Sequence, residues 1–314
     1  MVKEPESLGF AARTAETARR VAALKVRTTQ AVQGLLGGMH RSPHRGASVV
    51  FVEHRAYRPG DDLRLLDWRA FARTDRHAVK RFEQETQLRA SLLLDRSASM
   101  AWRGFADTGP SKHDHAATLL GALAYVLHRQ GDAVAAMGFG ATIHTDALGH
   151  GTRPSHLEGV LQLLARAPAD EEATALDDCL REAAHRTKRR GVVVVASDLL
   201  DERIGPAHED GPPVLRSLTA LTARGHDVLV LHVLHPDELH LPDVGAARFV
   251  DPESGRRLET EVESVRAGYQ RELGAFLESC RRRCTAAGAS YCLAPVDEAP
   301  EHVLARALGS RGGR

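Results

Sequence analysis

The 314-residue sequence lacks an excess of charge of either sign. It contains 42 lysines and arginines against 41 aspartates and glutamates, which gives a formal net charge of +1. This balance argues against nucleic-acid binding through overall charge and against a highly acidic or disordered chain. Hydrophobic residues make up 43% of the sequence. A chain of this length and composition has enough apolar material for one large domain or two modest ones.

Long apolar runs and paired cysteines are also missing. No stretch approaches the roughly 20 apolar residues that a membrane-spanning helix needs, and no cleavable signal sequence opens the chain. The cysteines are Cys179, Cys280, Cys284 and Cys292, and none forms a C-x-x-C pair. Cys280 and Cys284 are spaced by one helical turn, but no second pair with zinc-site spacing accompanies them. We therefore expect reduced, buried or idle thiols in a soluble cytoplasmic protein without a membrane span.

Two signatures of common enzymes are absent. A P-loop needs G-x-x-x-x-G-K-[ST] to cradle phosphates, and the nearest stretch, residues 104–112 (GFADTGPSK), has proline where the lysine belongs. No nucleophile elbow of the G-x-S-x-G type is present either. These absences argue against a P-loop NTPase and against a serine hydrolase.

The most informative feature that is present is an apolar strand that runs into three oxygen-bearing residues. Residues 90–94 (ASLLL) are followed by Asp95, Ser97 and Ser99 in the pattern Asp-x-Ser-x-Ser. Hard oxygen ligands suit Mg²⁺ or Mn²⁺ better than zinc or copper. By itself the pattern is weak, because serine-rich turns and helix caps commonly follow strands.

From residue 90 onward, short apolar runs alternate with helical patterns. Strands are predicted at 92–94, 133–139, 192–196, 228–234 and 290–293, and helices at 113–129, 155–166, 175–189, 214–224, 264–287 and 300–308. Such alternation predicts crossover connections and a mainly parallel sheet. We therefore predict an α/β fold with three layers and a doubly wound sheet. The run Val192–Val195 is apolar on both faces and is predicted to be central in it.

A second set of oxygen ligands is predicted at the same edge of the sheet. The strand at 192–196 ends in Ser197 and Asp198, and the carboxyl ends of parallel strands lie on one edge, where ligands bind in open α/β sheets. Thr174 stands in a loop just before a helix, with Thr145 and Thr152 as substitutes because spacing does not fix the loop register. Two hydroxyls, one or two carboxylates and waters would approach the octahedral shell of Mg²⁺.

The first 89 residues differ in character from the rest. Residues 6 to about 36 show a loose helical stripe with basic residues on the other faces. Those faces could meet a membrane surface or nucleic acid, but a solvated face of a packing helix is favoured. Residues 41–89 are rich in arginine and acidic residues, with strands predicted at 49–52 and 79–83.

The five predicted ligands Asp95, Ser97, Ser99, Thr174 and Asp198 resemble the metal-ion-dependent adhesion site of von Willebrand factor A domains, over about residues 90 to 295. The preceding segment carries a more specific resemblance. From about residue 20 to the end, the chain resembles the bacterial family of domain of unknown function 58. The motifs are residues 38–43 (GMHRSP), 51–62 (FVEHRAYRPGDD), 67–73 (DWRAFAR) and 79–85 (VKRFEQE).

Genes of this family commonly accompany MoxR-type AAA+ ATPases. The resemblance therefore implies a role beside such an ATPase, and that role is expected to be non-enzymatic. It implies an adaptor or cofactor of such an ATPase that binds Mg²⁺ or Mn²⁺ and an unknown client protein, with full metal occupancy only when a partner is bound. The expected organisation is a basic helix (1–40), an extension (41–89), a von Willebrand factor A-like domain (90–296) and a C-terminal helix and tail (297–314).

The extension admits two interpretations. Its mixed charges can satisfy one another as a structural network that fastens it to the sheet, which is favoured. The alternative is a recognition surface for the ATPase, comprising Arg55, Tyr57, Arg58, Asp61, Asp62, Asp67 and Trp68.

Two other roles for the whole protein stay open. An aspartyl-phosphate phosphatase would use Asp95 as nucleophile, but such enzymes need a second acid two residues on, where Ser97 stands. The fold could also survive as a scaffold with an empty site.

Overall fold

The computed structural model describes residues 18–33, 50–56, 78–83, 87–168, 174–187, 189–200, 214–252 and 255–309. Its centre is a six-stranded sheet in the order β10-β7-β6-β3-β4-β5. The strands are β3 (Arg89–Asp95), β4 (Ala133–Phe139), β5 (Leu148–Gly151), β6 (Val192–Ser197), β7 (Asp227–Leu234) and β10 (Ser290–Pro295). All neighbours pair in parallel except β4 and β5. The predicted α/β fold with a mainly parallel sheet is confirmed.

Each central strand is apolar on both faces because each face is covered by helices. Along β3, Leu92 and Leu94 lie in one core cluster and Leu93 in the other. Val194 and Val195 of β6 divide between the two clusters in the same way. Since successive side chains of a strand point to opposite faces, the continuous apolar runs require a layer of helices on each side.

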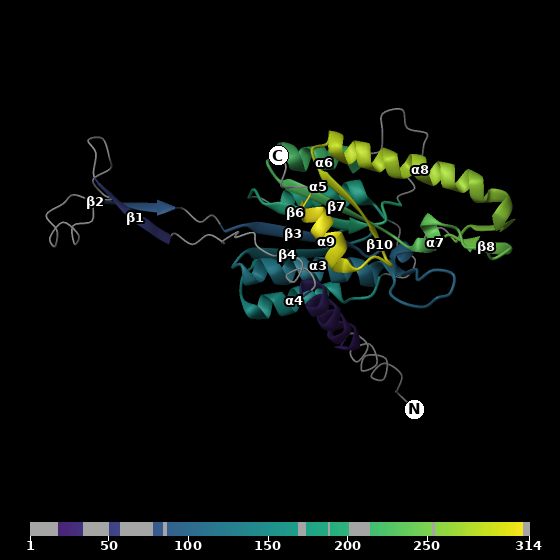
Figure 1. Ribbon diagram of the computed structural model, residues 1–314, viewed down its shortest axis with the longest axis horizontal. Helices are drawn as coiled ribbons and strands as arrows, with labels where there is room; N and C mark the ends of the chain where they lie inside the picture. The colour runs from purple at the N-terminus through teal and green to yellow at the C-terminus, as the bar shows by residue number, and fades with distance from the viewer. Residues whose placement is uncertain are drawn as a thin grey trace, which may run out of the picture.

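The helices form these two layers (Figure 1). One layer contains α3 (Lys112–Arg129), α4 (Pro154–Leu164) and α9 (Pro300–Gly309). The other contains α5 (Leu176–Arg186), α6 (Val214–Ala223) and α8 (Val262–Ala286). The structure adds a short 3-10 helix, η2 (Ala98–Ala101), and a single turn, α7 (Pro236–Leu239). Within the described residues, no helix combines the length and apolar character needed to cross a bilayer.

The helix at residues 18–33 packs on the α3 and α4 side of the molecule. Its Val21 and Leu24 are buried in the core there. Its basic residues contact the protein itself: Arg20 Nε donates to the carbonyl of Ala165 (2.8 Å), and Lys25 Nζ lies 2.7 Å from a carboxylate oxygen of Glu158. The helix therefore packs on the protein, and Arg20 and Lys25 contact the protein as well as solvent.

Two hairpins flank the main body. The predicted strands near residues 50 and 80 are present as β1 (Val50–Ala56) and β2 (Ala78–Glu83), which pair antiparallel and stand apart from the sheet (Figure 1). A second antiparallel hairpin, β8 (Ala246–Val250) with β9 (Arg257–Glu261), was not predicted. It lies at the carboxyl-end side of the sheet, next to α7 and α8 (Figure 1).

Gly191, just before β6, lies directly against the backbone at the start of β3. A Cβ at this position would lie 2.1 Å from the carbonyl oxygen of Arg89. Gly191→Ala is therefore expected to destabilise the fold by about 1–3 kcal/mol, because β6 must shift away from β3. Urea unfolding measures the change, and Gly149→Ala is the control, since nothing lies within 4 Å of a Cβ at Gly149. Equal stability of the two variants would contradict this account of the β3–β6 contact.

Candidate metal centre

The carboxyl ends of β3 and β6 lie side by side at the centre of the sheet. The chain passes from β3 to β4 and β5 on one side, and then crosses to β6, β7 and β10 on the other. A ligand crevice is expected where the strand order reverses in this way, outside the carboxyl ends of the strands. Asp95 ends β3 and Asp198 directly follows β6, so both carboxylates belong to this position.

The turn after β3 gathers Asp95, Ser97 and Ser99. One Asp95 oxygen, Oδ1, accepts a hydrogen bond from the backbone N–H of Ser97 (2.9 Å). The Ser97 and Ser99 hydroxyl oxygens lie 3.1 Å apart. All three side chains are buried. The 3-10 helix η2 turns the chain at once, and this brings Ser99 back beside Ser97.

The turn after β6 fixes Asp198 at the neighbouring position. Leu199 has a φ of +55°, a left-handed conformation that is strained for a leucine and that concentrates at functional sites. The N–H groups of Leu199 and Leu200 donate to Ser197 Oγ (3.0 Å) and Asp198 Oδ1 (3.2 Å). Behind the turn, His232 Nε2 lies 2.8 Å from the Asp198 carbonyl oxygen, and burial lowers the His232 pKa to about 4, so the ring is neutral.

Ser197 joins the two turns directly. Its hydroxyl donates to Asp95 Oδ2 at 2.6 Å. Burial, followed by the negative charge of Asp198, raises the pKa of Asp95 to about 7, although hydrogen bonds from Ser197 and Ser97 oppose the increase. The two carboxylates are therefore close enough to repel each other in a dry site, and a cation between them would relieve that repulsion.

A buried lysine also reaches this site. Lys112, the first residue of α3, is 1% exposed, and its Nζ lies 2.8 Å from Asp198 Oδ2 and 2.6 Å from Glu238 Oε1 of α7. Burial disfavours the ammonium, but the two carboxylates outweigh burial and hold the Lys112 pKa above its ordinary value. Asp198 and Glu238 thus share one ammonium, whereas Asp95 is hydrogen-bonded to Ser97 and Ser197. When Asp95 is ionised, the site carries two uncompensated negative charges.

Thr174 lies at the same edge of the sheet. The N–H of the next residue, Ala175, donates to the carbonyl of Gly140, which follows β4 (2.9 Å). Thr174 is buried, whereas Thr145 and Thr152 are exposed. Of the three threonines considered from the sequence, Thr174 is therefore the buried one, and its role as a ligand stays a prediction.

The donor set fits a hard divalent cation. Asp95, Ser97, Ser99, Thr174 and Asp198 offer only oxygen atoms, as Mg²⁺ and Mn²⁺ prefer. Among the described residues, no group of three or more His, Cys, Asp or Glu side chains is placed to hold a metal. A cation at this edge would therefore depend on the hydroxyls, which leave it strongly electrophilic. Burial raises the pKa values of the Cys280 and Cys284 thiols to about 11 and about 12, so both are protonated.

The predicted partner surface falls largely outside the described part of the chain. Arg55 lies in β1. The remaining members lie outside the described residues, namely Tyr57, Arg58, Asp61, Asp62, Asp67 and Trp68. That surface stays a prediction.

Sequence reasoning missed Lys112, Glu238 and the role of Ser197. Packing brings Lys112 and Glu238 together across 126 residues, which no local pattern shows. One signal was available: a lysine in the first turn of a helix opposes the helix dipole. Such a violation of a local rule often marks a functional site.

Known proteins resemble the chain as follows. Residues 53–275 match the family described as protein of unknown function DUF58. Two uncharacterised proteins, Rv1480 of Mycobacterium tuberculosis and Mb1516 of Mycobacterium bovis, are each 30% identical over 273 residues, covering 85% of this chain and 80% of theirs.

Solved structures that resemble this chain have lower sequence identity to it. BatB from Bacteroides thetaiotaomicron is 17% identical, with a TM-score of 0.46, over 71% of this chain and 98% of BatB. The VWA domain of SpRpn10 is 9% identical, with a TM-score of 0.41, over 70% of this chain and 95% of that domain. The match over residues 53–275 and the mycobacterial relatives show that this chain belongs to the DUF58 family of proteins of unknown function.

Proposed function

We propose that the protein is a metal-dependent protein-binding module, an adaptor or cofactor of a MoxR-type AAA+ ATPase that acts on a client protein. The observation that carries the proposal is the oxygen set at the strand-order switch, where Asp95 and Asp198 are joined through Ser197 and flanked by the hydroxyls of Ser97 and Ser99. The set resembles a metal-ion-dependent adhesion site.

The residues of such a site would have different roles. Ser97, Ser99 and Thr174 would offer hydroxyl ligands, and Asp95 and Asp198 would supply the negative charge. A bound Mg²⁺ or Mn²⁺ would supply an open coordination position for a carboxylate of another protein. Ser197 holds the Asp95 carboxylate, Lys112 neutralises part of the negative charge of the site, and the strained Leu199 turn keeps Asp198 at the edge.

When Asp95 is ionised, the two uncompensated negative charges of the site favour a divalent occupant over a second protein cation. Lys112 already neutralises one of three carboxylates at the site. A divalent ion would balance the remaining two charges, and a partner's carboxylate would then add to a site no longer strongly anionic. The recognition surface for the ATPase within residues 41–89 is kept as the alternative to the favoured structural network of mixed charges.

A phosphatase that uses Asp95 is the second candidate, and the residue contacts favour it less. The position of its required second acid is held by Ser97, whose hydroxyl contacts that of Ser99. Metal-dependent turnover of phosphoesters that is abolished by Asp95→Asn would favour this activity over binding alone.

The test of the binding role is metal-dependent capture. The full chain, immobilised, is expected to retain a MoxR-type ATPase or a client from the native cell in Mg²⁺ and to lose at least nine-tenths of it in EDTA or after Asp95→Ala. Asp243→Ala is the matched control, because the Asp243 side chain is 92% exposed. Capture that is unchanged in both EDTA and Asp95→Ala would contradict metal bridging.

A further inference from the structure

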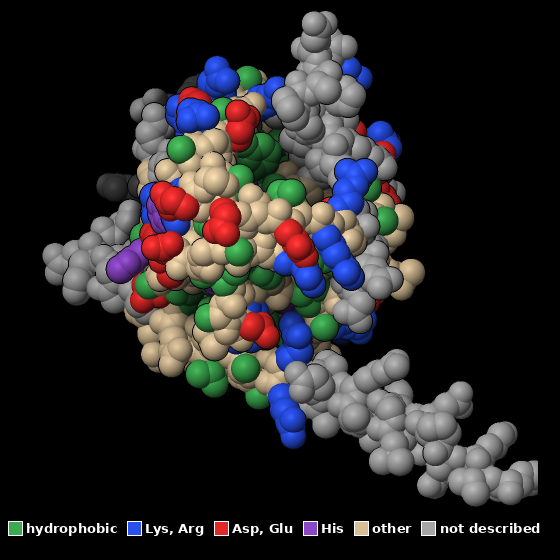
Figure 2. All heavy atoms as spheres, turned by 90° about the vertical axis from the view of Figure 1, so that its right-hand side faces the viewer, with side chains coloured by type: hydrophobic (Ala, Val, Ile, Leu, Met, Phe, Trp, Pro, Cys, Tyr) green, Lys and Arg blue, Asp and Glu red, His purple; other side chains and the backbone are tan. Residues whose placement is uncertain are grey.

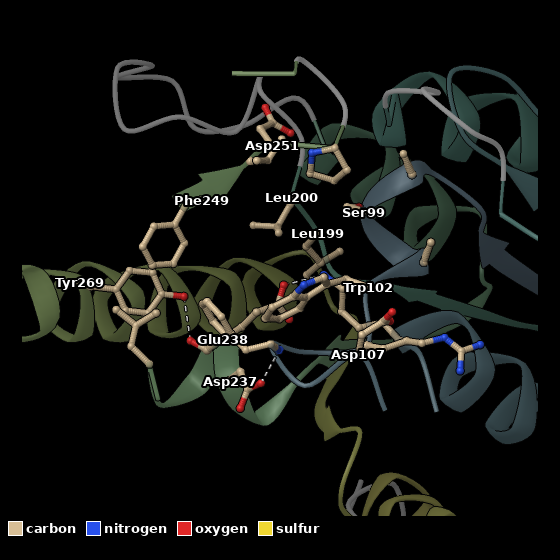
Figure 3. Close-up of a pocket in the computed structure, with 18 of the residues that line it drawn as sticks. Ser99, Trp102, Asp107, Leu199, Leu200, Asp237, Glu238, Phe249, Asp251 and Tyr269 are labelled. Atoms are coloured by element: carbon tan, nitrogen blue, oxygen red, sulfur yellow. Dashed lines mark hydrogen bonds and ion pairs between the residues drawn. The ribbon is translucent and has the colours of Figure 1, made fainter. Parts of the chain in front are cut away.

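A cavity of about 740 Å³ opens beside the candidate metal centre. Its lining includes Ser99 of the oxygen set (Figure 3) and Lys112, whose ammonium contacts Asp198. The volume lies in the range of pockets that bind small molecules or anchoring side chains. Any molecule held at the metal would therefore border this cavity.

The walls of the cavity are mainly apolar and aromatic. Trp102 and Phe105 pack edge to face with ring centroids 5.8 Å apart, and Phe105 contacts Phe249 of β8 in the same way. From the other side, Tyr269 of α8 donates to the Glu238 carbonyl (2.7 Å; Figure 3). The hairpin, α8 and the loop after η2 thus supply the apolar walls of the cavity.

The mouth of the cavity exposes apolar side chains to solvent. Phe105, Leu200 and Val250 all line it and are 38%, 43% and 52% exposed. The view onto this edge of the sheet shows hydrophobic side chains within a hollow (Figure 2). A contiguous apolar patch on a soluble surface is typical of an interaction site.

The charges around the cavity are mainly acidic. Asp107, Asp237 and Asp251 belong to its lining. The described basic side chains of the lining are Arg103 and Lys112, and both are engaged: Arg103 with Asp114 (3.4 Å) and Lys112 with Asp198 and Glu238. The lining therefore holds more carboxylates than cations, because Glu238 also belongs to it, and this acidic composition complements a basic group.

We propose that the cavity is a specificity pocket for one segment of a partner protein. A bulky apolar side chain of that segment enters the cavity, a neighbouring carboxylate reaches the metal, and a basic side chain faces the acidic rim. This inference rests on the proposed function, since it places the partner's carboxylate at the metal. It adds the sequence chemistry of that partner: acidic, aromatic or large aliphatic, and basic residues close together.

Synthetic peptides test the pocket. Each dye-labelled peptide contains one aspartate, one lysine and one tryptophan in a glycine and serine background, with the tryptophan one to four residues from the aspartate. A matched peptide has serine instead of tryptophan. Fluorescence anisotropy in Mg²⁺ is expected to show at least one spacing at which the tryptophan peptide binds the full-length protein at least tenfold more tightly than its match.

Substitutions at the mouth locate the effect. Val250→Arg and Leu200→Arg, on two different elements, are each expected to abolish the tryptophan advantage. Leu258→Arg is the control, because Leu258 is an exposed apolar residue of the same hairpin as Val250 but does not line the cavity. Thermal unfolding confirms that each variant is folded.

Several outcomes would overturn the inference. One is that no tryptophan peptide binds more tightly than its match, including no binding of either. Another is an advantage that survives both mouth variants. Dimerisation that Val250→Arg prevents, without a tryptophan advantage, would assign the cavity to a second copy of the chain. Calorimetric titration of the wild type and of Asp95→Ala with Mg²⁺ tests the metal site separately. Failure of the pocket inference would therefore not contradict the proposed function.

Discussion

Replacing Lys112 by methionine is expected to destabilise the metal-free protein by about 3–5 kcal/mol, because it strands buried carboxylates without a counter-charge. The Lys112 ammonium lies within 2.8 Å of oxygens from both Asp198 and Glu238, and the side chains of Lys112 and Asp198 are at most 1% exposed. Methionine retains most of the apolar packing of the lysine side chain, so the loss of stability reports the removal of the positive charge. Urea unfolding in EDTA measures it.

Magnesium should partly rescue this variant. Without the ammonium, the site keeps three carboxylates, so Lys112→Met is expected to bind Mg²⁺ about tenfold more tightly than the wild type and to gain more stability from it. Lys25→Met is the control: it removes an ion pair to Glu158 in which both side chains are more than 40% exposed, and it should cost at most about 1 kcal/mol. Weaker Mg²⁺ binding by Lys112→Met would instead make Lys112 a residue that positions Asp198.

The sequence predicted the parts of the fold whose signal is local. The strands β3, β4, β6 and β7 are continuous apolar runs because both of their faces are covered. β5 was missed because its sequence, LGHG, has two glycines and a histidine and pairs antiparallel at the sheet edge. The hairpin strands β8 (AARFV) and β9 (RLETE) are largely exposed and carry charged residues, so burial leaves little pattern in them.

The candidate site divides in the same way. Asp95, Ser97 and Ser99 follow one strand at fixed spacing, and the parallel sheet brings Asp198 to their edge, so a motif and a topology rule suffice to group them. The groups that set the electrostatics come from elsewhere in the chain. Lys112 reaches Asp198 across 86 residues and Glu238 across 126, and only the packing of α3 against the strand ends determines these contacts.

Asp95→Asn is expected to stabilise the metal-free protein at pH 8 by roughly 2 kcal/mol or more while abolishing stabilisation by Mg²⁺. The folded-state pKa of Asp95 is raised from 3.8 to about 7, chiefly by burial and then by Asp198. The folded protein therefore holds a proton that the unfolded chain has already lost, and the wild type loses stability as pH rises from about 4 to about 7. Asparagine is neutral throughout and does not suffer this loss.

Thermal unfolding at pH 5 and pH 8, in EDTA and in Mg²⁺, separates these effects. In EDTA, the advantage of Asp95→Asn over the wild type should be large at pH 8 and small at pH 5, where Asp95 is still protonated in the folded state. Mg²⁺ must displace that proton, so it should raise the wild-type melting temperature more at pH 8 than at pH 5 and leave the variant unchanged. Asp243→Asn, at a 92% exposed carboxylate, should match the wild type under all four conditions. If Asp95→Asn still gains stability from Mg²⁺, Asp95 is not a ligand of the metal. If Asp95→Asn is less stable than the wild type in EDTA at pH 8, the hydrogen bonds that Asp95 accepts from Ser97 and Ser197 outweigh the cost of its buried charge.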